Sequence, residues 1–188
     1  MNFRQLLAKY VTGNITTDQL PDIAIKALEE KLNSPSLCIL AGLHKSEIPS
    51  QVDHYFKYAL EELNIPLPDK RQAALEYSFA LVDEIVDGKK EMIEAVNEIF
   101  HRALDRYDFD SENIRYRYDS IGFETAYGLF VTYNDLRDAD RPWQAGKTNE
   151  ELMIEVKEQL LQELIKWKNK NLAINQKKKH NDADTNIY

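Results

Sequence analysis

Two amphipathic helical segments joined by a tight break, between Asp69 and Tyr107, constrain the fold of this chain most strongly. Apolar residues recur at spacings of three and four on both sides of the pair Asp87-Gly88, as expected for one helix face. Asp69 follows a Pro-Leu-Pro turn and can cap the first segment, and Gly88 suits the left-handed position after a helix end. Because a connection this short brings two helices together antiparallel, we expect a central antiparallel helical hairpin.

Further helical stripes precede and follow this hairpin. Ser34 and Pro35 predict the start of a short helix that ends before Gly42, and its apolar run predicts that the helix is buried, with Cys38 in the core. Thr148 and Glu151 form a capping-box pattern at the start of the last stripe. We therefore predict an all-α, irregular multi-helix fold of about seven helices. A single domain is expected over residues 1–169, with a flexible polar tail over residues 170–188.

Charge and composition exclude several classes of partner. The 188 residues carry a net charge of −8, which disfavours binding to nucleic acid and to anionic membranes. An internal disulfide is impossible with one cysteine, and the chain has no apolar run of the length that spans a bilayer. No signal peptide is evident at the N-terminus, so we expect a cytoplasmic protein.

The segment between Tyr107 and Tyr133 is unusually aromatic, holding eight of the chain's aromatic residues interleaved with carboxylates. Tyrosine offers a large contact area with a polar end, and flanking carboxylates attract a basic partner. Ile114, Tyr116 and Tyr118 alternate with arginines, which favours a short extended stretch. The predicted partner-binding residues are Asp105, Tyr107, Asp108, Asp110, Glu112, Tyr116, Tyr118 and Asp119. Phe123, Tyr127 and Phe130 have helical spacing and are expected in the core.

The alternative prediction is a metal-dependent helical-bundle enzyme, either a hydrolase or an oxygen-using enzyme. Glu98 and His101 have the spacing used in di-iron bundles, Glu94 lies on the same face, and Asp83 or Glu84 of the preceding segment offers a further carboxylate. Such a site needs a second Glu–His pair, which this chain lacks.

Other chemistry is poorly supported by the sequence. The acidic run from Asp108 to Asp119 has neither the glycine at its sixth position nor the glutamate at its twelfth that a calcium loop requires. We find no nucleophile elbow and no phosphate-binding glycine loop. We therefore predict no catalytic residue, no metal site and no cofactor.

The stretch from Leu28 to Leu43 resembles a motif of uncharacterised small bacterial helical proteins. It reads Leu-Glu-Glu, then Ser-Pro-Ser-Leu from Ser34, then Leu-Ala-Gly-Leu from Leu40, with Lys31-Leu32-Asn33 where a glycine-containing turn is expected. The resemblance implies a bacterial origin and a helical fold, and it transfers no catalytic residue. By analogy with small acidic bacterial proteins, we predict a non-catalytic protein-binding module of the immunity or antitoxin type, whose partner is a basic, toxin-like protein.

Overall fold

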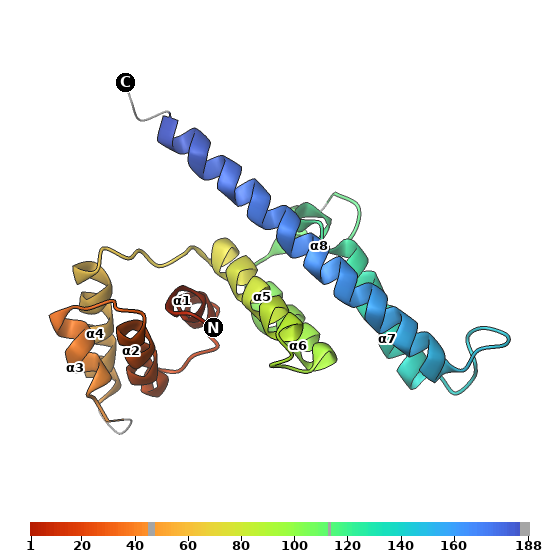
Figure 1. The fold of residues 1–188 in the computed structure, drawn as a ribbon, viewed down its shortest axis with the longest axis horizontal. Coiled ribbons are helices and arrows are strands. Elements are labelled where there is room, and N and C mark those ends of the chain that lie inside the picture. Colours follow the sequence, from red (N-terminus) through yellow and green to blue (C-terminus); the bar gives the residue numbers. More distant parts are fainter. Residues whose placement is uncertain (45–47, 113, 185–188) are drawn as a thin grey trace. The chain divides into compact units, whose positions relative to one another are not determined.

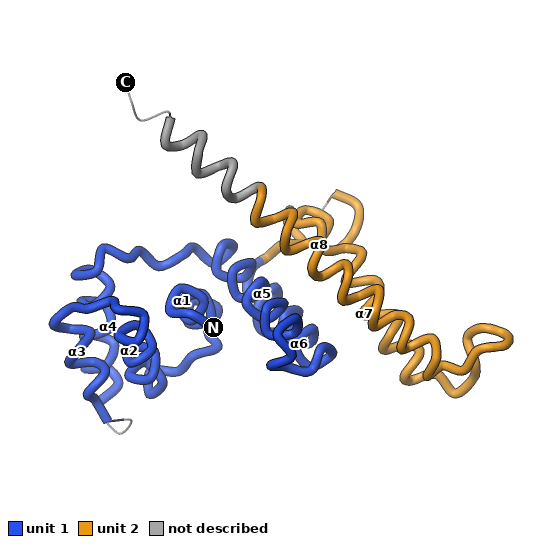
Figure 2. The backbone as a smooth tube through the Cα atoms, in the orientation of Figure 1, with its two compact units in different colours: residues 1–107 blue, residues 108–188 orange. Residues whose placement is uncertain are grey.

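The computed structural model describes residues 1–44, 48–112 and 114–184, with side chains described as far as residue 173. Within these ranges the chain forms eight α-helices, one π-helix and four short 3-10 helices, and no strand. The all-α fold is therefore confirmed. The helices group into two compact units, unit 1 over residues 1–107 and unit 2 over residues 108–188 (Figure 2). A single domain over residues 1–169 stays a prediction, because compact units of one chain can belong to one cooperatively folding domain.

The first helices of unit 1 pack around a shared apolar core (Figure 1). They are α1 (Phe3–Val11), the 3-10 helix η1 (Thr17–Gln19), α2 (Leu20–Glu29), α3 (Pro35–Ala41) and α4 (Pro49–Glu62). Helix α3 packs against α2 and α4, and α1 packs against α2. The fully buried members of this core are contributed by all four α-helices: Leu7, Leu20, Ala24, Ala27, Leu37, Leu40 and Ala59.

The start of α3 is fixed by side chains, as the sequence predicts. The hydroxyl of Ser34 accepts a hydrogen bond from the backbone N–H of Leu37, and Glu62 of α4 accepts bonds from the N–H and hydroxyl of Ser36 at 3.0 and 2.8 Å. The prediction that α3 is buried all round is wrong. Cys38 is exposed, because α3 packs through only one face, on which Leu37 lies.

The second half of unit 1 contains the segments predicted to form a hairpin. Helix α5 (Lys70–Val86) starts at Asp69, whose carboxylate accepts the Gln72 N–H at 2.8 Å, and it is followed by Gly88 with φ of +66°. Helix α6 (Met92–Glu98) continues into the π-helix Ile99–Ala103 and the 3-10 helix η3 (Leu104–Arg106). All three pack against α5, which also packs against α1. The packed pair of segments is thus present, and its central role in the whole fold stays a prediction.

Unit 2 is built on two long helices. The 3-10 helices η4 (Phe109–Glu112) and η5 (Asp119–Ile121) precede α7 (Glu124–Asp138), which packs along α8 (Asn149–Asp184) (Figure 1). The capping box is confirmed, since Thr148 and Glu151 exchange side-chain and backbone bonds of 2.9 and 3.2 Å. Buried residues join the two helices: Phe123, Phe130, Leu160, Leu164 and Trp167.

Helix α8 runs through residues 170–184, part of the range for which the sequence predicts a flexible polar tail. The helix extends this far because the chain has no glycine or proline after Gly146 that would stop it. Flexibility of the tail stays a prediction, and its last residues, 185–188, lie outside the described part of the chain. Among the described residues, no helix combines the length and the apolar character needed to cross a membrane.

Candidate functional site

The segment predicted to bind a partner contains a tight loop, Ile114–Asp119, that one carboxylate organises. Asp119 accepts hydrogen bonds from the backbone N–H groups of Ile114 at 3.0 Å, Arg115 at 2.7 Å and Tyr116 at 3.1 Å. The bond from Ile114 and those from its neighbours hold the pKa of the Asp119 carboxyl below its usual range. Asp119 therefore supports the loop from within, whereas the sequence analysis placed it among the partner-facing groups.

Tyr118 anchors this loop to the interior of unit 2. Its side chain is 2% exposed and makes edge-on ring contacts with Phe109, Phe123 and Tyr127 at centroid distances of 6.3, 6.3 and 5.6 Å. The expectation that Tyr118 faces a partner is therefore wrong. The expected extended segment is also absent, because Tyr118 has a left-handed backbone with φ of +65° and the carboxylate of Asp119 folds the preceding residues into a turn.

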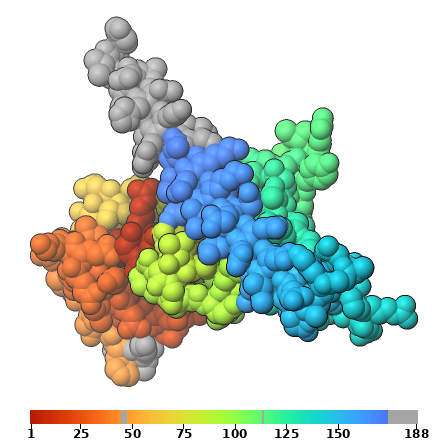
Figure 3. Space-filling view, turned by 45° about the vertical axis from the view of Figure 1, so that its right-hand side comes forward, coloured from red at the N-terminus to blue at the C-terminus, as the bar shows by residue number. Residues whose placement is uncertain are grey.

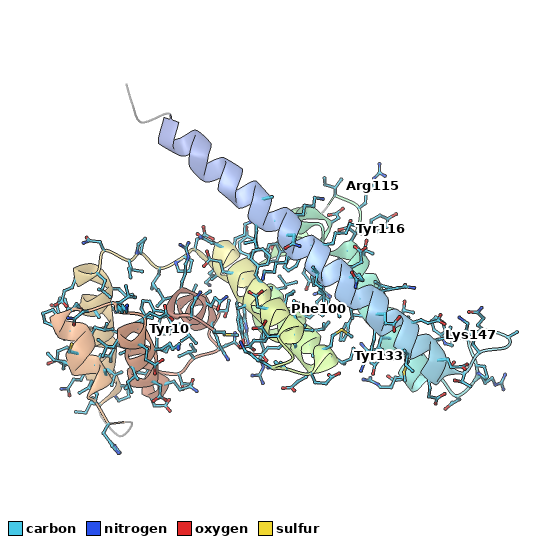
Figure 4. All side chains as sticks on the ribbon, in the orientation of Figure 1. Tyr10, Phe100, Arg115, Tyr116, Tyr133 and Lys147 are labelled. Atoms are coloured by element: carbon cyan, nitrogen blue, oxygen red, sulfur yellow. The ribbon has the colours of Figure 1, made fainter. Side chains whose placement is uncertain are left out.

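The tip of the loop points to solvent. Ile114 is 86% exposed and Tyr116 is 67% exposed, and Arg115 and Tyr116 project away from the helices (Figure 4). Across the described residues, the guanidinium of Arg115 forms no hydrogen bond or ion pair. The next arginine differs, since Arg117 stacks over the rings of Tyr118 and Tyr127 at 4.9 and 5.5 Å. The tip therefore exposes an apolar, a cationic and an aromatic side chain to solvent.

The remaining predicted residues are dispersed. In unit 2, Asp108 accepts the Ser111 N–H at 3.2 Å, and Asp110 lies 3.9 Å from Arg117. Glu112, at the end of η4, is half-buried. Two other predicted residues belong to unit 1, where Asp105 lies 3.3 Å from His101 and Tyr107 is half-buried. Tyr116 is thus the one predicted tyrosine that is fully accessible for binding.

A second loop of unit 2, Ala139–Lys147, also presents an aromatic side chain. Asn149 accepts the backbone N–H of Trp143 at 3.1 Å and donates to the carbonyls of Ala139 and Arg141 at 3.4 and 3.2 Å. Trp143 is 56% exposed. None of the predicted partner-binding residues lies in this segment. The available signal was the tripeptide Arg141-Pro142-Trp143, because tryptophan and arginine are enriched among the residues that dominate interfaces.

The residues of the alternative metal site do not converge. The side chains of Glu94 and His101 are 70% and 69% exposed, and that of Glu98 is 10% exposed. Glu84 lies 3.8 Å from the N-terminal amine. Within the described part of the chain, no group of three or more His, Cys, Asp or Glu side chains is placed to hold a metal ion.

Glu98 instead belongs to a half-buried ionic cluster at the junction of α5, α6 and α1. Its carboxylate accepts hydrogen bonds from the Tyr77 hydroxyl and the Lys90 ammonium, and Lys9 lies 3.9 Å away. Burial opposes ionisation of Glu98, but the bonds from Lys90 and Tyr77 outweigh it and hold its pKa below the usual range. Burial and the bond to Glu98 raise the pKa of Tyr77. Two ammonium groups beside one carboxylate would repel a metal cation.

Two recesses in the described part of the surface offer no obvious catalytic site. In unit 1, a cavity of about 360 Å³ is lined by apolar residues that include Phe3, Leu7 and Leu67. Its charged residues are already engaged, since Arg4 pairs with Glu76 at 3.0 Å and Glu30 accepts the Phe3 N–H at 2.7 Å. A shallower groove of about 530 Å³ lies between α7 and α8 in unit 2. Neither brings a nucleophile next to a base.

Comparison of the chain with protein-family models, with curated proteins and with solved structures finds no match. The motif that carries the bacterial resemblance has a structural explanation in this fold, because Ser34 caps α3, Leu37 and Leu40 are buried, and Gly42 follows the helix. The resemblance itself stays a prediction.

Proposed function

We propose that this chain is a non-catalytic protein-binding module that acts through the Ile114–Asp119 loop. The observation that carries the proposal is the contrast between a fixed backbone and free side chains. Three consecutive N–H groups are held by Asp119, while Ile114 and Tyr116 are 86% and 67% exposed. Because Ile114 and Tyr116 are exposed, burial of their side chains does not stabilise the fold. We expect these two side chains to be buried instead at an interface with a partner.

The rigidity of the loop supports a binding role. Association costs free energy whenever side chains and backbone become ordered, and a loop that is ordered beforehand avoids much of this cost. The anchoring of Tyr118 in the interior and the bonds to Asp119 provide that order. Tyrosine adds contact area with only two rotatable side-chain bonds, which keeps the remaining entropy loss small.

We further propose that the module is of the bacterial immunity or antitoxin type and neutralises a toxin-like protein in the cytoplasm. The net charge of −8 supports this class, since it accelerates encounter with a partner of positive net charge. The predicted partner is therefore basic overall, and the loop determines how it is held.

Photo-crosslinking in living cells tests the binding role. The full chain would carry benzoylphenylalanine at position 116, and a matched version would carry it at Tyr58, an exposed tyrosine of α4 in unit 1. We expect one protein to be crosslinked at position 116 and absent at position 58. No adduct, or the same adducts at both positions, would contradict the proposed loop.

The immunity role has its own test. The gene of the crosslinked protein would be expressed alone, with this chain, and with its Tyr116→Ala variant. We expect growth arrest that the unchanged chain relieves and the variant relieves poorly. If the partner is harmless when expressed alone, the immunity role is excluded, whereas the proposed protein-binding role stands.

A further inference from the structure

The two exposed loops of unit 2, residues 114–119 and 139–147, have the same arrangement of side chains. In each, the side chain of an Asp or Asn binds the loop backbone, Asp119 in the first loop and Asn149 in the second. Each loop then carries an exposed arginine close in sequence to an exposed aromatic residue, Arg115 with Tyr116 and Arg141 with Trp143. Both loops protrude from unit 2, the first in green and the second in blue-cyan (Figure 3). Two separate segments thus present the same combination of side chains.

The guanidinium groups of Arg115 and Arg141 have no polar partner among the described residues. Arg141 is exposed and, like Arg115, forms no side-chain hydrogen bond or ion pair with any residue of the described ranges. Three carboxylates near these loops are engaged elsewhere, since Asp119 binds backbone N–H groups, Asp138 pairs with Arg137 at 2.8 Å and Glu155 pairs with Lys147. The first tip is therefore locally cationic, although the whole chain is acidic, and at the second tip Arg141 lies beside the exposed Asp140.

We infer that both loops are contact sites, and that the partner offers carboxylates beside two apolar recesses. This inference rests on the proposed binding function and names the chemistry of the partner surface. Arginine forms strong, directional bonds with carboxylates, and the neighbouring ring fills apolar space, a pairing that is common among the residues that dominate interfaces. The long-range attraction of a basic partner and the local contact with its carboxylates act at different distances and are compatible.

Position in the fold makes this a two-point contact. The first loop precedes α7 and the second follows it, so the 15 residues of this helix separate them by roughly 22 Å. Two contacts on one rigid unit bind the same partner cooperatively, because the second contact forms within an existing complex. The surface of one folded protein is wide enough to contact both loops across this separation. Nucleic acid is disfavoured because the chain carries a net charge of −8, which repels a phosphate backbone at long range.

The experiment measures binding of the full chain to the purified protein that is crosslinked at position 116. Arg115→Glu and Arg141→Glu would be compared with Lys166→Glu, a control on α8 that makes the same change in net charge at a side chain 73% exposed. We expect each loop variant to weaken binding at least about tenfold, mainly through faster dissociation, and the control to change it less than about threefold. Trp143 fluorescence should shift to shorter wavelength on binding, as its ring leaves water.

The outcomes separate the inference from the function on which it rests. If Arg141→Glu equals the Lys166→Glu control, the second loop is no contact site, and the first loop still binds. If Arg115→Glu strengthens binding, the recess is basic and the inference fails while the proposed function stands. If no protein is crosslinked at position 116, both fail.

Discussion

The hydroxyl of Tyr77 in α5 donates a hydrogen bond to the carboxylate of Glu98, the last residue of α6. Lys90 bonds the same carboxylate from the turn before α6, and Lys9 of α1 lies 3.9 Å away. One carboxylate thus joins three parts of unit 1, and the π-helix starts at the following residue. A charge in this position is stable only while its partners remain, so the cluster controls how unit 1 responds to mutation and to pH.

Loss of the Glu98 carboxylate should be costly. Glu98→Ala leaves Lys90 without its main partner, with a side chain only 20% exposed, and losing a hydrogen bond to a charged group typically costs about 1.5–3 kcal/mol of unfolding free energy. Tyr77→Phe removes one donor and should cost about 1–2 kcal/mol. Urea denaturation measures both. The control is His101→Ala, whose side chain is 69% exposed and which should change stability by less than about 0.5 kcal/mol. Equal effects of Glu98→Ala and His101→Ala would show that the cluster contributes nothing.

Acid should weaken unit 1 through the same carboxyl group. The pKa of Glu98 is lower in the folded protein than its ordinary value of 4.5, so its contribution to stability is complete above that pH and is lost as the pH falls through the folded pKa. The Glu98→Gln variant has no ionisable side chain at this position, so it cannot bind or release a proton there as the pH changes. We therefore expect the stability advantage of the unchanged protein over Glu98→Gln to be constant near neutrality and to shrink below about pH 4.5. An advantage that is independent of pH would contradict this assignment.

High pH should destabilise the fold through Tyr77, which donates the hydrogen bond to Glu98. The pKa of Tyr77 is raised above its ordinary value of 10.0, first by burial and then by its bond to Glu98. A raised pKa stabilises the fold below the ordinary value, and this contribution is lost as the pH rises through the folded pKa. Stability should therefore fall above about pH 10 more steeply in the unchanged protein than in Tyr77→Phe, when both are unfolded by urea. Parallel pH profiles would exclude Tyr77 as the cause.

The π-helix that follows Glu98 was not predicted, although the sequence carries a sign of it. Buried apolar pairs recur every four residues along this segment: Ala95-Val96, Ile99-Phe100 and Ala103-Leu104. This interval exceeds the 3.6 residues of an α-helical turn, so a regular α-helix would rotate each successive pair by about 40° away from α5. The wider turn of a π-helix restores the alignment. Asn14 adds a bond of 2.6 Å to the carbonyl of Arg102, a contact between distant segments that no local pattern reveals.

Local signals predicted the helix ends well, because caps depend on neighbouring residues. Asp69, Ser34 and the Thr148–Glu151 pair act as their sequence patterns indicate. The exposure of Cys38 and the burial of Tyr118 were missed, because both depend on what another helix or loop covers. The same limit applies to the binding loop. The aromatic content of the segment was visible in the sequence, but the use of Asp119 as an internal support was not.

Removing the support of the first loop should expose it to proteolysis. Asp119→Ala leaves the N–H groups of Ile114, Arg115 and Tyr116 without their acceptor, so the loop becomes able to adopt the extended form that a protease needs. Trypsin should then cut after Arg115 several times faster, with helix content by circular dichroism unchanged. Asp135→Ala is the matched control, since Asp135 is an exposed aspartate of α7 that lies outside the loop. Identical cleavage rates in the two variants would show that Asp119 does not restrain the loop.

The second loop can be tested through its own fluorophore. Asn149→Ala removes one acceptor and one donor side-chain group from the loop backbone, while the Thr148–Glu151 capping box still starts α8. Trp143 should therefore gain rapid local motion, seen as a larger fast component in the decay of fluorescence anisotropy. Trp167 supplies a constant background, because its ring is 3% exposed and its N–H donates to the carbonyl of Ile121 at 2.8 Å. Trp143→Phe measures that background alone, and Gln144→Ala changes an exposed neighbour without touching the support. If Asn149→Ala and Gln144→Ala decay alike, the loop is held by something other than Asn149, and Trp143 is not presented on a preformed turn.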